Sequence, residues 1–273
     1  MTLISGELVV VRGAGDLATG VIVRLVRAGF RVAALEAAQP SAIRRTVCLS
    51  EAIYEGRAEV EGVRAVRAGS VEELAAMLEH PGPVPVLVDP GCAALPRLRP
   101  LALVDAIIAK RNLGTRIGMA EVVVALGPGF EAGVDADAVV ETNRGHDLGR
   151  VLLSGRAEPD TGAPGLIQGM GRERVVHAPV AGVVSSLKRI GEPVQAGEPI
   201  LALIGAEGRV EVPAVIDGVL RGLIRPGYTV HAGMKVADVD PRCRREHCFT
   251  ISDKALAVAG GVLEAILLLG ARR

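Results

Sequence analysis

The chain has 273 residues, 49% of them hydrophobic, and its 31 basic and 31 acidic side chains cancel to a formal net charge of zero. Balanced charge argues against nucleic acid as a partner and against a polybasic contact with a membrane. The length favours two domains. Four cysteines without a visible export signal favour free thiols in a reducing, cytoplasmic compartment.

The chain opens with a predicted strand, glycine turn, helix and second strand. The apolar run at residues 7–12 breaks at Gly13 and Gly15, and apolar residues then recur at helical spacing. The next strand, residues 31–35, closes on Glu36. This order is typical of a dinucleotide-binding crossover.

Each small residue of that unit has an expected role. Gly13 would make the tight turn, Gly15 would let the backbone approach a pyrophosphate, and Ala18 would allow close packing of helix on strand. Glu36 would accept a ribose hydroxyl, which favours NAD over NADP. Asp16 opposes this prediction, because its carboxylate could cap the helix and would repel a phosphate. A turn that only joins strand to helix therefore stays an alternative.

Polar turns follow the later strands as well. Apolar runs at residues 84–88, 102–108, 122–126 and 138–140 each end in a polar, glycine-bearing segment. In an open parallel sheet the ligand crevice lies outside the carboxyl ends of the strands. The residues expected to face one cleft are Asp89, Cys92, Lys110, Arg111, Asn112, Gly127, Gly129, Glu141, Asn143, Arg144 and His146.

Three of these residues are candidate catalytic groups. Lysine occurs at only four positions, and Lys110 with Arg111 and Asn112 could clamp an anionic ligand, or form a solvated turn. Cys92 could carry sulfur chemistry if a cation lowered its pKa, or be an inert small residue. His146, beside Asp147, is an acid–base candidate or orders its loop through a hydrogen bond.

Residues 178–197 return as residues 214–233, with three glycines of each copy in register at a constant offset. Such a repeat predicts two intertwined halves that share one core. Its glycine pattern resembles the biotinyl/lipoyl hammerhead, which carries a modified lysine between its halves. Glu207 stands at that position, so we expect neither biotin nor lipoate, and the repeat would serve as a cover or an interaction surface.

The C-terminal segment contains a possible metal cluster and a buried helix. Cys243, His247 and Cys248 have ligand chemistry for zinc, but no second pair lies within the usual reach, and we predict no metal. Ser252 is a good N-cap for an apolar helix too short to span a bilayer. Gly260 and Gly261 each cost that helix about 1 kcal/mol, which suggests close approach to another backbone or to a ligand.

These elements predict an α/β fold class. Residues 1–171 would form a Rossmann-like domain with a parallel sheet and a ligand site. Residues 172–242 would form a small, duplicated all-β domain like a barrel-sandwich hybrid. Residues 243–273 would form a C-terminal helix that packs on the first domain.

Several ordered motifs resemble the YqeB family of selenium-dependent molybdenum hydroxylase system proteins, which is distantly similar to XdhC accessory factors. The resemblance implies an accessory role in maturing molybdenum hydroxylases, with molybdopterin or a nucleotide as the ligand and a hydroxylase as a possible client. It runs from about residue 8 to the C-terminus on the motifs at residues 12–20 (RGAGDLATG), 43–45, 105–115 (DAIIAKRNLGT), 126–133 (LGPGFEAG), 141–146 (ETNRGH), 161–165 and 251–254 (ISDK).

Two other functions remain open at this point. In an NAD-dependent oxidoreductase, Glu36 would bind the ribose and His146 would donate a proton. In a non-catalytic adaptor, the repeat domain would dock client proteins.

Overall fold

A computed structural model describes residues 6–206 and 208–271 and divides the chain into two compact units. The first comprises Met1–Pro40, Cys48–Thr161 and Ile251–Arg273, and the second comprises Ser41–Val47 and Gly162–Thr250. The units therefore differ in extent from the predicted ranges 1–171, 172–242 and 243–273. Glu207 lies outside the described residues.

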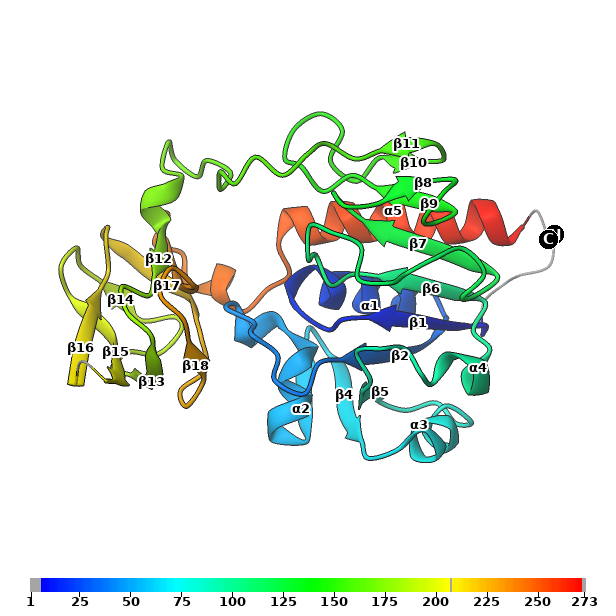
Figure 1. Cartoon of the computed structure of the whole chain (residues 1–273), viewed down its shortest axis with the longest axis horizontal. Helices are drawn as coiled ribbons and strands as arrows, with labels where there is room; N and C mark the ends of the chain where they lie inside the picture. The colour runs from blue at the N-terminus through cyan, green and yellow to red at the C-terminus, as the bar shows by residue number, and fades with distance from the viewer. Residues whose placement is uncertain (1–5, 207, 272–273) are drawn as a thin grey trace. The chain divides into compact units, whose positions relative to one another are not determined.

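The first unit is built on a nine-stranded sheet with the order β10-β9-β7-β6-β1-β2-β5-β4-β3 (Figure 1). Neighbouring strands from β4 across to β9 pair in parallel, and their apolar residues are buried because helices or loops cover both faces. The strands are β1 (Leu8–Arg12), β2 (Arg31–Glu36), β3 (Arg57–Val60), β4 (Val63–Ala68), β5 (Val84–Val88), β6 (Ala102–Asp105), β7 (Val122–Leu126), β9 (Ala138–Val140) and β10 (Val151–Leu152). Beside this sheet, β8 (Glu131–Ala132) pairs with β11 (Gly155–Arg156).

Both edges of the sheet are antiparallel. β3 and β4 form a hairpin whose two turn residues, Glu61 and Gly62, both have positive φ, the backbone that two-residue hairpins favour. At the other edge β10 returns along β9. The sheet is therefore mixed, and the predicted Rossmann-like parallel sheet is wrong. No strand was predicted at residues 57–68, where the charged residues of β4 recur at every third position and not at every second.

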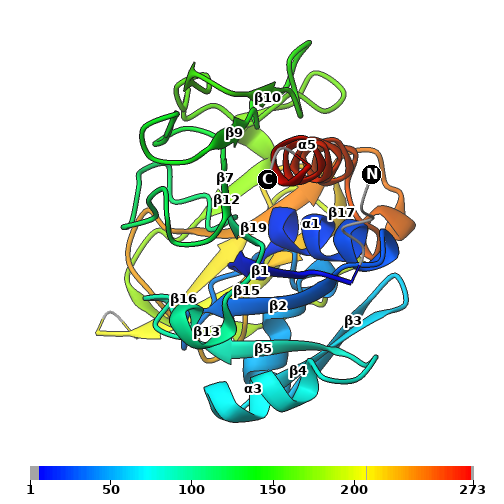
Figure 2. The same cartoon turned by 90° about the vertical axis from the view of Figure 1, so that its right-hand side faces the viewer.

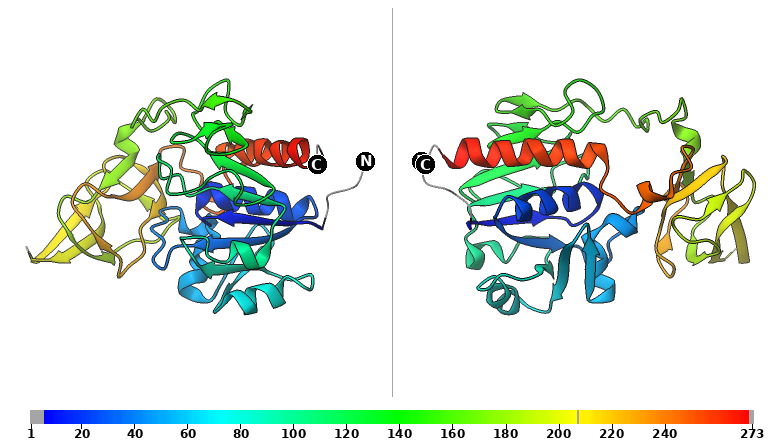
Figure 3. Two further views of the ribbon diagram at one scale, coloured as in Figure 1. Left: turned by 45° about the vertical axis from the view of Figure 1, so that its right-hand side comes forward. Right: turned by 180° about the vertical axis from the view of Figure 1, so that it is seen from behind.

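Two helices lie side by side on one face of this sheet, α1 (Asp16–Arg27) and α5 (Asp253–Gly270) (Figure 2 and the right-hand view of Figure 3). They pack closely because Gly20 has no side chain: an added Cβ would lie 2.9 Å from the Cβ of Ala255. On the other face Leu74 and Leu95 pack on strand residues that include Val10. They come from α3 (Val71–Met77) and α4 (Leu95–Leu98).

The remaining helical turns are short. They are α2 (Ala52–Glu55) and the 3-10 turns η1 (Arg45–Val47), η2 (Leu49–Glu51), η3 (Arg172–Arg174) and η4 (Arg245–Cys248). Within the described part of the chain, no helix combines the length and the apolar character that a bilayer crossing requires.

Gly260 and Gly261 of α5 lie in different environments. An added Cβ on Gly261 would collide with the carbonyl oxygen of Gly149, whereas one on Gly260 would meet no atom within 4 Å. Gly149 in turn lies against Ala257, whose carbonyl oxygen is 2.6 Å from the place of an added Cβ. The expected close approach to another backbone is confirmed for Gly261, and the side chain of Ser252 caps the helix as expected, accepting from the Ala255 amide.

The second unit contains two four-stranded antiparallel sheets around one hydrophobic core. One sheet has the order β12-β19-β17-β14 and the other β16-β15-β13-β18. The strands are β12 (Val175–His177), β13 (Gly182–Ser186), β14 (Pro193–Val194), β15 (Pro199–Gly205), β16 (Gly208–Pro213), β17 (Gly218–Leu223), β18 (Thr229–Val230) and β19 (Lys235–Asp240). β13 of the first copy pairs with β18 of the second, and β14 pairs with β17, so the copies interlock.

This unit also differs from the predicted hammerhead-like domain. It takes in residues 41–47, and the Ile43 carbonyl accepts a hydrogen bond of 2.8 Å from the Leu223 amide. Gly222 leaves room for this segment, since an added Cβ there would lie 2.7 Å from Ile43. The predicted fold class, a Rossmann-like parallel sheet plus a barrel-sandwich-hybrid-like domain, is therefore corrected to a mixed-sheet α/β unit and a two-sheet β unit.

The two adjacent glycines of α5 allow a matched test of this packing. We expect Gly261→Ala to lower the free energy of unfolding by about 1–3 kcal/mol, because the methyl group overpacks the contact with Gly149. Gly260→Ala should raise it by up to about 1 kcal/mol through helix propensity. Denaturant unfolding of both variants measures the difference. Equal stabilities would contradict the packing of α5 described above.

Candidate functional site

The predicted phosphate-binding turn is largely closed by the protein itself. The Gly13 amide donates to the Leu35 carbonyl at 2.7 Å, and the Ala14 amide donates to the Glu36 carboxylate at 2.8 Å. The Ala14 carbonyl accepts from the Ser50 amide at 2.8 Å, and both Gly13 and Ala14 are buried. Two donors that could face a pyrophosphate are thus already occupied.

The Glu36 carboxylate is hydrogen-bonded to backbone amides. Its second oxygen accepts from the Ala37 amide at 2.7 Å, and burial raises the pKa of its carboxyl despite these two amides. Beside Gly15, in contrast, an added Cβ would meet no atom within 4 Å. Gly15 is also the N-cap of α1, and Asp16 is the acidic residue of the first turn. Binding of NAD or molybdopterin at these residues and at Ala18, which is buried, stays a prediction.

Hydrogen bonds from the buried side chain of Arg12 hold the loop after β6. This buried guanidinium donates to Asp105 at 3.2 Å, to the Thr115 hydroxyl at 2.9 Å and to the Leu113 carbonyl at 3.0 Å. Asn112 adds a local turn, because its side-chain oxygen accepts from the Thr115 amide at 2.8 Å. Asn112 therefore shapes the loop and does not point an unused amide at a ligand.

The same loop carries backbone strain. Ile108 (φ 59°) and Lys110 (φ 61°) both adopt the left-handed conformation, which is a genuine outlier for a β-branched residue. Gly129 (φ +104°) holds the loop from the side, since an added Cβ would lie 2.6 Å from the Arg111 backbone. Gly127 (φ +71°) is likewise required by its contact with Thr142. Strain of this kind persists where surrounding structure over-determines it, often at functional sites.

A charge cluster centred on Lys254 lies at the carboxyl edge of this sheet. Lys254 is in the first turn of α5 and is partly buried. Burial lowers the pKa of its ammonium, and the nearby Arg144 guanidinium acts in the same direction, whereas the carboxylates of Asp16, Glu141 and Asp160 oppose the shift. Charged residues from segments distant in sequence thus act electrostatically on one amine.

The other cations of the cluster are paired. Arg144 donates two hydrogen bonds to Asp253, of 2.7 and 3.0 Å. Lys110 forms an ion pair of 2.7 Å with Asp160. The predicted clamp residue Lys110 therefore neutralises a carboxylate of the cluster, and it stays a candidate through that contact.

Lys254 itself makes neither a hydrogen bond nor an ion pair with any residue in the ranges 6–206 and 208–271. The buried carboxylate of Glu141 accepts from two backbone amides, Asn143 at 2.6 Å and Glu158 at 2.7 Å. The cluster thus contains an amine whose hydrogen-bonding capacity is unused among the described residues.

The remaining candidates lie in other environments. Cys92 is buried, and burial raises the pKa of its thiol to about 11, so it is not an activated nucleophile. His146 and Arg111 are exposed and have no hydrogen-bond partner among the described residues, and their roles stay predictions. The described residues include no group of three or more potential ligands placed to hold a metal, which covers Cys243, His247 and Cys248.

Sequence reasoning included Lys254 in the motif at residues 251–254 but did not name it among the catalytic or cofactor-binding residues. Two signals were available: the rarity of lysine, and the polar Ser252-Asp253-Lys254 segment before an apolar helix. The carboxylates that act on its pKa, at residues 16, 141 and 160, are distant in the sequence, and no local pattern reports them.

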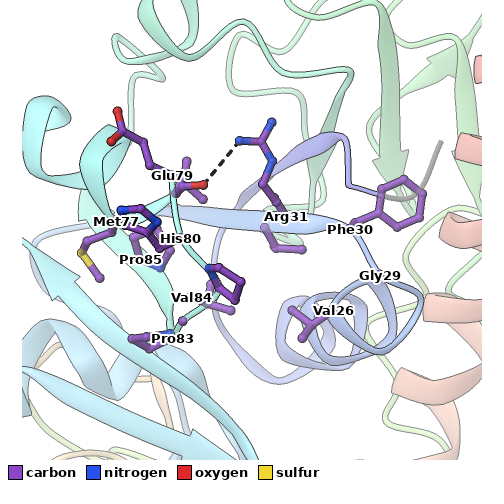
Figure 4. Close-up of a pocket in the computed structure, with 14 residues that line it drawn as sticks. Val26, Gly29, Phe30, Arg31, Met77, Glu79, His80, Pro83, Val84 and Pro85 are labelled. Carbon is purple, nitrogen blue, oxygen red and sulfur yellow. Dashed lines mark hydrogen bonds between the residues drawn. The ribbon is translucent and has the colours of Figure 1, made fainter.

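A separate pocket of about 330 Å³ lies at the amino ends of β2 and β5, the opposite edge of the sheet from Lys254 (Figure 4). Arg31 crosses it and donates to the Leu78 carbonyl at 3.4 Å. Proline and other apolar side chains form much of its wall. The lining residues are Val26, Gly29, Phe30, Arg31, Val32, Met77, Leu78, Glu79, His80, Pro81, Gly82, Pro83, Val84 and Pro85.

Fold and site together define an α/β protein with a lysine-centred charge cluster at the carboxyl edge of its sheet. Sequence comparison relates the chain to the protein named "Uncharacterized protein YqeB" of Escherichia coli (strain K12), with 49% identity over 263 residues. The match covers 96% of this chain and 48% of that protein, so the chain spans about half the length of the curated relative it matches. No family model matches the sequence. The resemblance to YqeB is thus confirmed, but nothing supports the link to selenium-dependent molybdenum hydroxylases or to XdhC.

Solved structures give weaker similarities. A succinylglutamate desuccinylase/aspartoacylase from Rhodobacter sphaeroides is 16% identical, with 86% of this chain and 85% of that chain covered and a TM-score of 0.30. The product-bound ectoine utilization protein EutE (DoeB) from Ruegeria pomeroyi is 20% identical, with 32% and 27% covered and a TM-score of 0.24. Similarities this low transfer no activity to the chain.

These comparisons correct the expected function. The solved structures named above carry desuccinylase, aspartoacylase and ectoine-utilization names, and the name of the curated relative assigns no function, so nothing there points to maturation of molybdenum hydroxylases. The accessory role in maturing such enzymes is therefore wrong as a conclusion from the sequence. The oxidoreductase and adaptor alternatives find no support there either. The function has to be inferred from the site itself.

The environment of Lys254 predicts a distinct titration. Because burial lowers its pKa, its neutral amine should appear at lower pH than that of Lys188, whose pKa is raised by a hydrogen bond with Glu198. Competitive acetylation across pH, with peptides read by mass spectrometry, resolves all four lysines. Arg144→Gln removes a like charge and should move the Lys254 midpoint upward. A Lys254 midpoint at or above that of Lys188 would contradict this environment.

Proposed function

We propose that this protein binds a small carboxylate metabolite at the carboxyl edge of the nine-stranded sheet, with Lys254 as the cation that receives it. One observation carries the proposal: the Lys254 amine has no partner among the described residues, while Asp253, Asp160 and Glu141 are each engaged by another donor. A partly buried ammonium without an acceptor gains most from an anionic ligand.

The charges around Lys254 favour a carboxylate over a phosphate. The carboxylates of Asp16, Glu141 and Asp160 are close enough to shift the Lys254 pKa, and they would repel a dianion more strongly than a monoanion. The occupied amide of Ala14 removes a donor that a phosphate would use. Arg111, exposed on the strained loop, is a second cation available at this edge.

The position of Lys254 is fixed before any ligand arrives. Ser252 caps the helix, Asp253 is held by Arg144 through two hydrogen bonds, and Ala255 packs against Gly20. Three sequence neighbours of Lys254, at 252, 253 and 255, are thus anchored within the same unit. Such preorganisation lowers the entropy cost of binding.

Calorimetric titration of the full chain tests the proposal with the monoanions pyruvate and lactate and with the dianions succinate and glutarate, which should bind more weakly because of the nearby carboxylates. A hydrogen bond to a charged group contributes about 1.5–3 kcal/mol, so Lys254→Met should weaken binding by about 10- to 100-fold. Lys188→Met is the matched control, because Lys188 lies in the second unit and is paired with Glu198. Equal affinities of the two variants for every acid that binds would reject the site, as would the absence of binding to all four.

NAD and molybdopterin form separate arms of the same titration. The open space beside Gly15 favours binding there, and the bond between Glu36 and Ala14 opposes it. A hydroxylase client stays a prediction from the sequence.

A further inference from the structure

We propose that the free edge of β16 (Gly208–Pro213) is a docking surface for a second copy of this chain, with β16 pairing antiparallel to β16 of the partner about Val210. β16 lies at one end of its four-stranded sheet (Figure 1). It is the longest edge strand described in the second unit, because β12 has three residues and β14 and β18 have two each. A free edge of this length presents backbone donors and acceptors to another strand.

The first observation is which residues of β16 turn their backbone groups toward that edge. Ala214, directly after the strand, donates to the Glu198 carbonyl and accepts from the Gly197 amide, both at 2.9 Å, so its backbone faces the β15 side. Backbone groups alternate in direction along a strand, so the even-numbered residues of β16 face β15 and the odd-numbered ones face the free edge. Pro213 fits this alternation, since it has no amide hydrogen to offer and proline is confined to such edges.

The second observation is a pair of opposite charges on the same two outward-facing positions. Arg209 and Glu211 are two residues apart, so their side chains share one face of the strand. This is the face away from the core, because Val212 on the other face is buried. The Arg209 Nη2 lies 3.6 Å from the Glu211 Oε1, and both side chains are about half exposed, at 49% and 51%. Such an exposed pair contributes little to its own chain.

These charges select one register for the pairing of two copies. With the two-fold axis at Val210, Arg209 lies opposite the partner's Glu211, and Glu211 lies opposite the partner's Arg209. Both pairs consist of outward-facing residues, so each pair can exchange two backbone hydrogen bonds. A shift of the axis by one residue in either direction would place two arginines or two glutamates directly opposite each other, which is destabilising.

The residue on the axis supports the same register. Val210 is half-buried and lies on the core side of the sheet, between the two charged positions. On the axis it meets the partner's Val210 in a pair without backbone hydrogen bonds, the arrangement in which opposite side chains approach most closely. The shared surface is small, so we expect a weak, concentration-dependent dimer. The inference concerns the second unit and does not depend on the proposed site at Lys254.

Sedimentation velocity of the full chain, from micromolar to near-millimolar concentration, tests the inference. We expect the wild type to shift from monomer to dimer over that range. Arg209→Glu and Glu211→Arg each turn two attractive pairs into two repulsive ones, so either alone should weaken dimerisation by about tenfold or more. An equimolar mixture of these two variants restores opposite charges in both pairs and should dimerise as well as the wild type does.

Arg189→Glu and Glu192→Arg are the matched controls. They make the same changes of charge in another ion pair of the second unit, at positions outside its strands, and should leave dimerisation unchanged. Thermal melting reports whether each variant is folded. A wild type that stays monomeric over the whole range would overturn the inference. So would a dimer that neither reversal in β16 weakens, or one that the mixture of the two variants fails to restore.

Discussion

The close packing of α5 determines where the candidate site lies. Gly20 meets Ala255, and Gly261 meets Gly149, at contacts too tight for a side chain on either glycine. These contacts fix the helix along its length, and its first turn carries Lys254. A helix shifted outward by one methyl group at each contact would take the amine away from the carboxylates. The position of Lys254 thus depends on the absence of side chains at Gly20 and Gly261.

The buried ion pair of Arg12 and Asp105 likewise fixes the loop after β6. Arg12 satisfies its guanidinium with Asp105, Thr115 and a backbone carbonyl. A buried ion pair recovers its desolvation cost only when its remaining groups are also hydrogen-bonded, and this one meets that condition. The loop that these hydrogen bonds hold contains Ile108, whose backbone is left-handed.

Local patterns predicted the first crossover well and its chemistry poorly. The strand, glycine turn, helix and strand ending at Glu36 all form as expected. The glycines at 13, 127 and 129 have positive φ or close contacts that need them. Yet the Glu36 carboxylate, which was expected to bind a ribose, accepts a hydrogen bond from the Ala14 amide. Sequence spacing places an acid at the end of the strand, but it cannot show whether the protein itself occupies the expected ligand position. The antiparallel edge at β3 and β4 was missed although β3 alternates charged and apolar residues, the pattern of a half-buried strand; in β4 the arginines recur at every third position instead. The Lys254 cluster was missed because it joins residues that are far apart in the sequence, at positions 16, 141, 144, 160 and 254.

The interlocked repeat of the second unit bears on how such a fold can arise. Each copy leaves a gap in its own sheet that a strand of the other copy fills, β18 beside β13 and β14 beside β17. A peptide with one copy alone could close those gaps only by exchanging strands with a second identical peptide, as in a domain-swapped dimer. The strand pairing of this unit is therefore that of a domain-swapped homodimer whose two chains have been fused. Tandem duplication of an ancestral half-sized peptide is a direct route to such a fold.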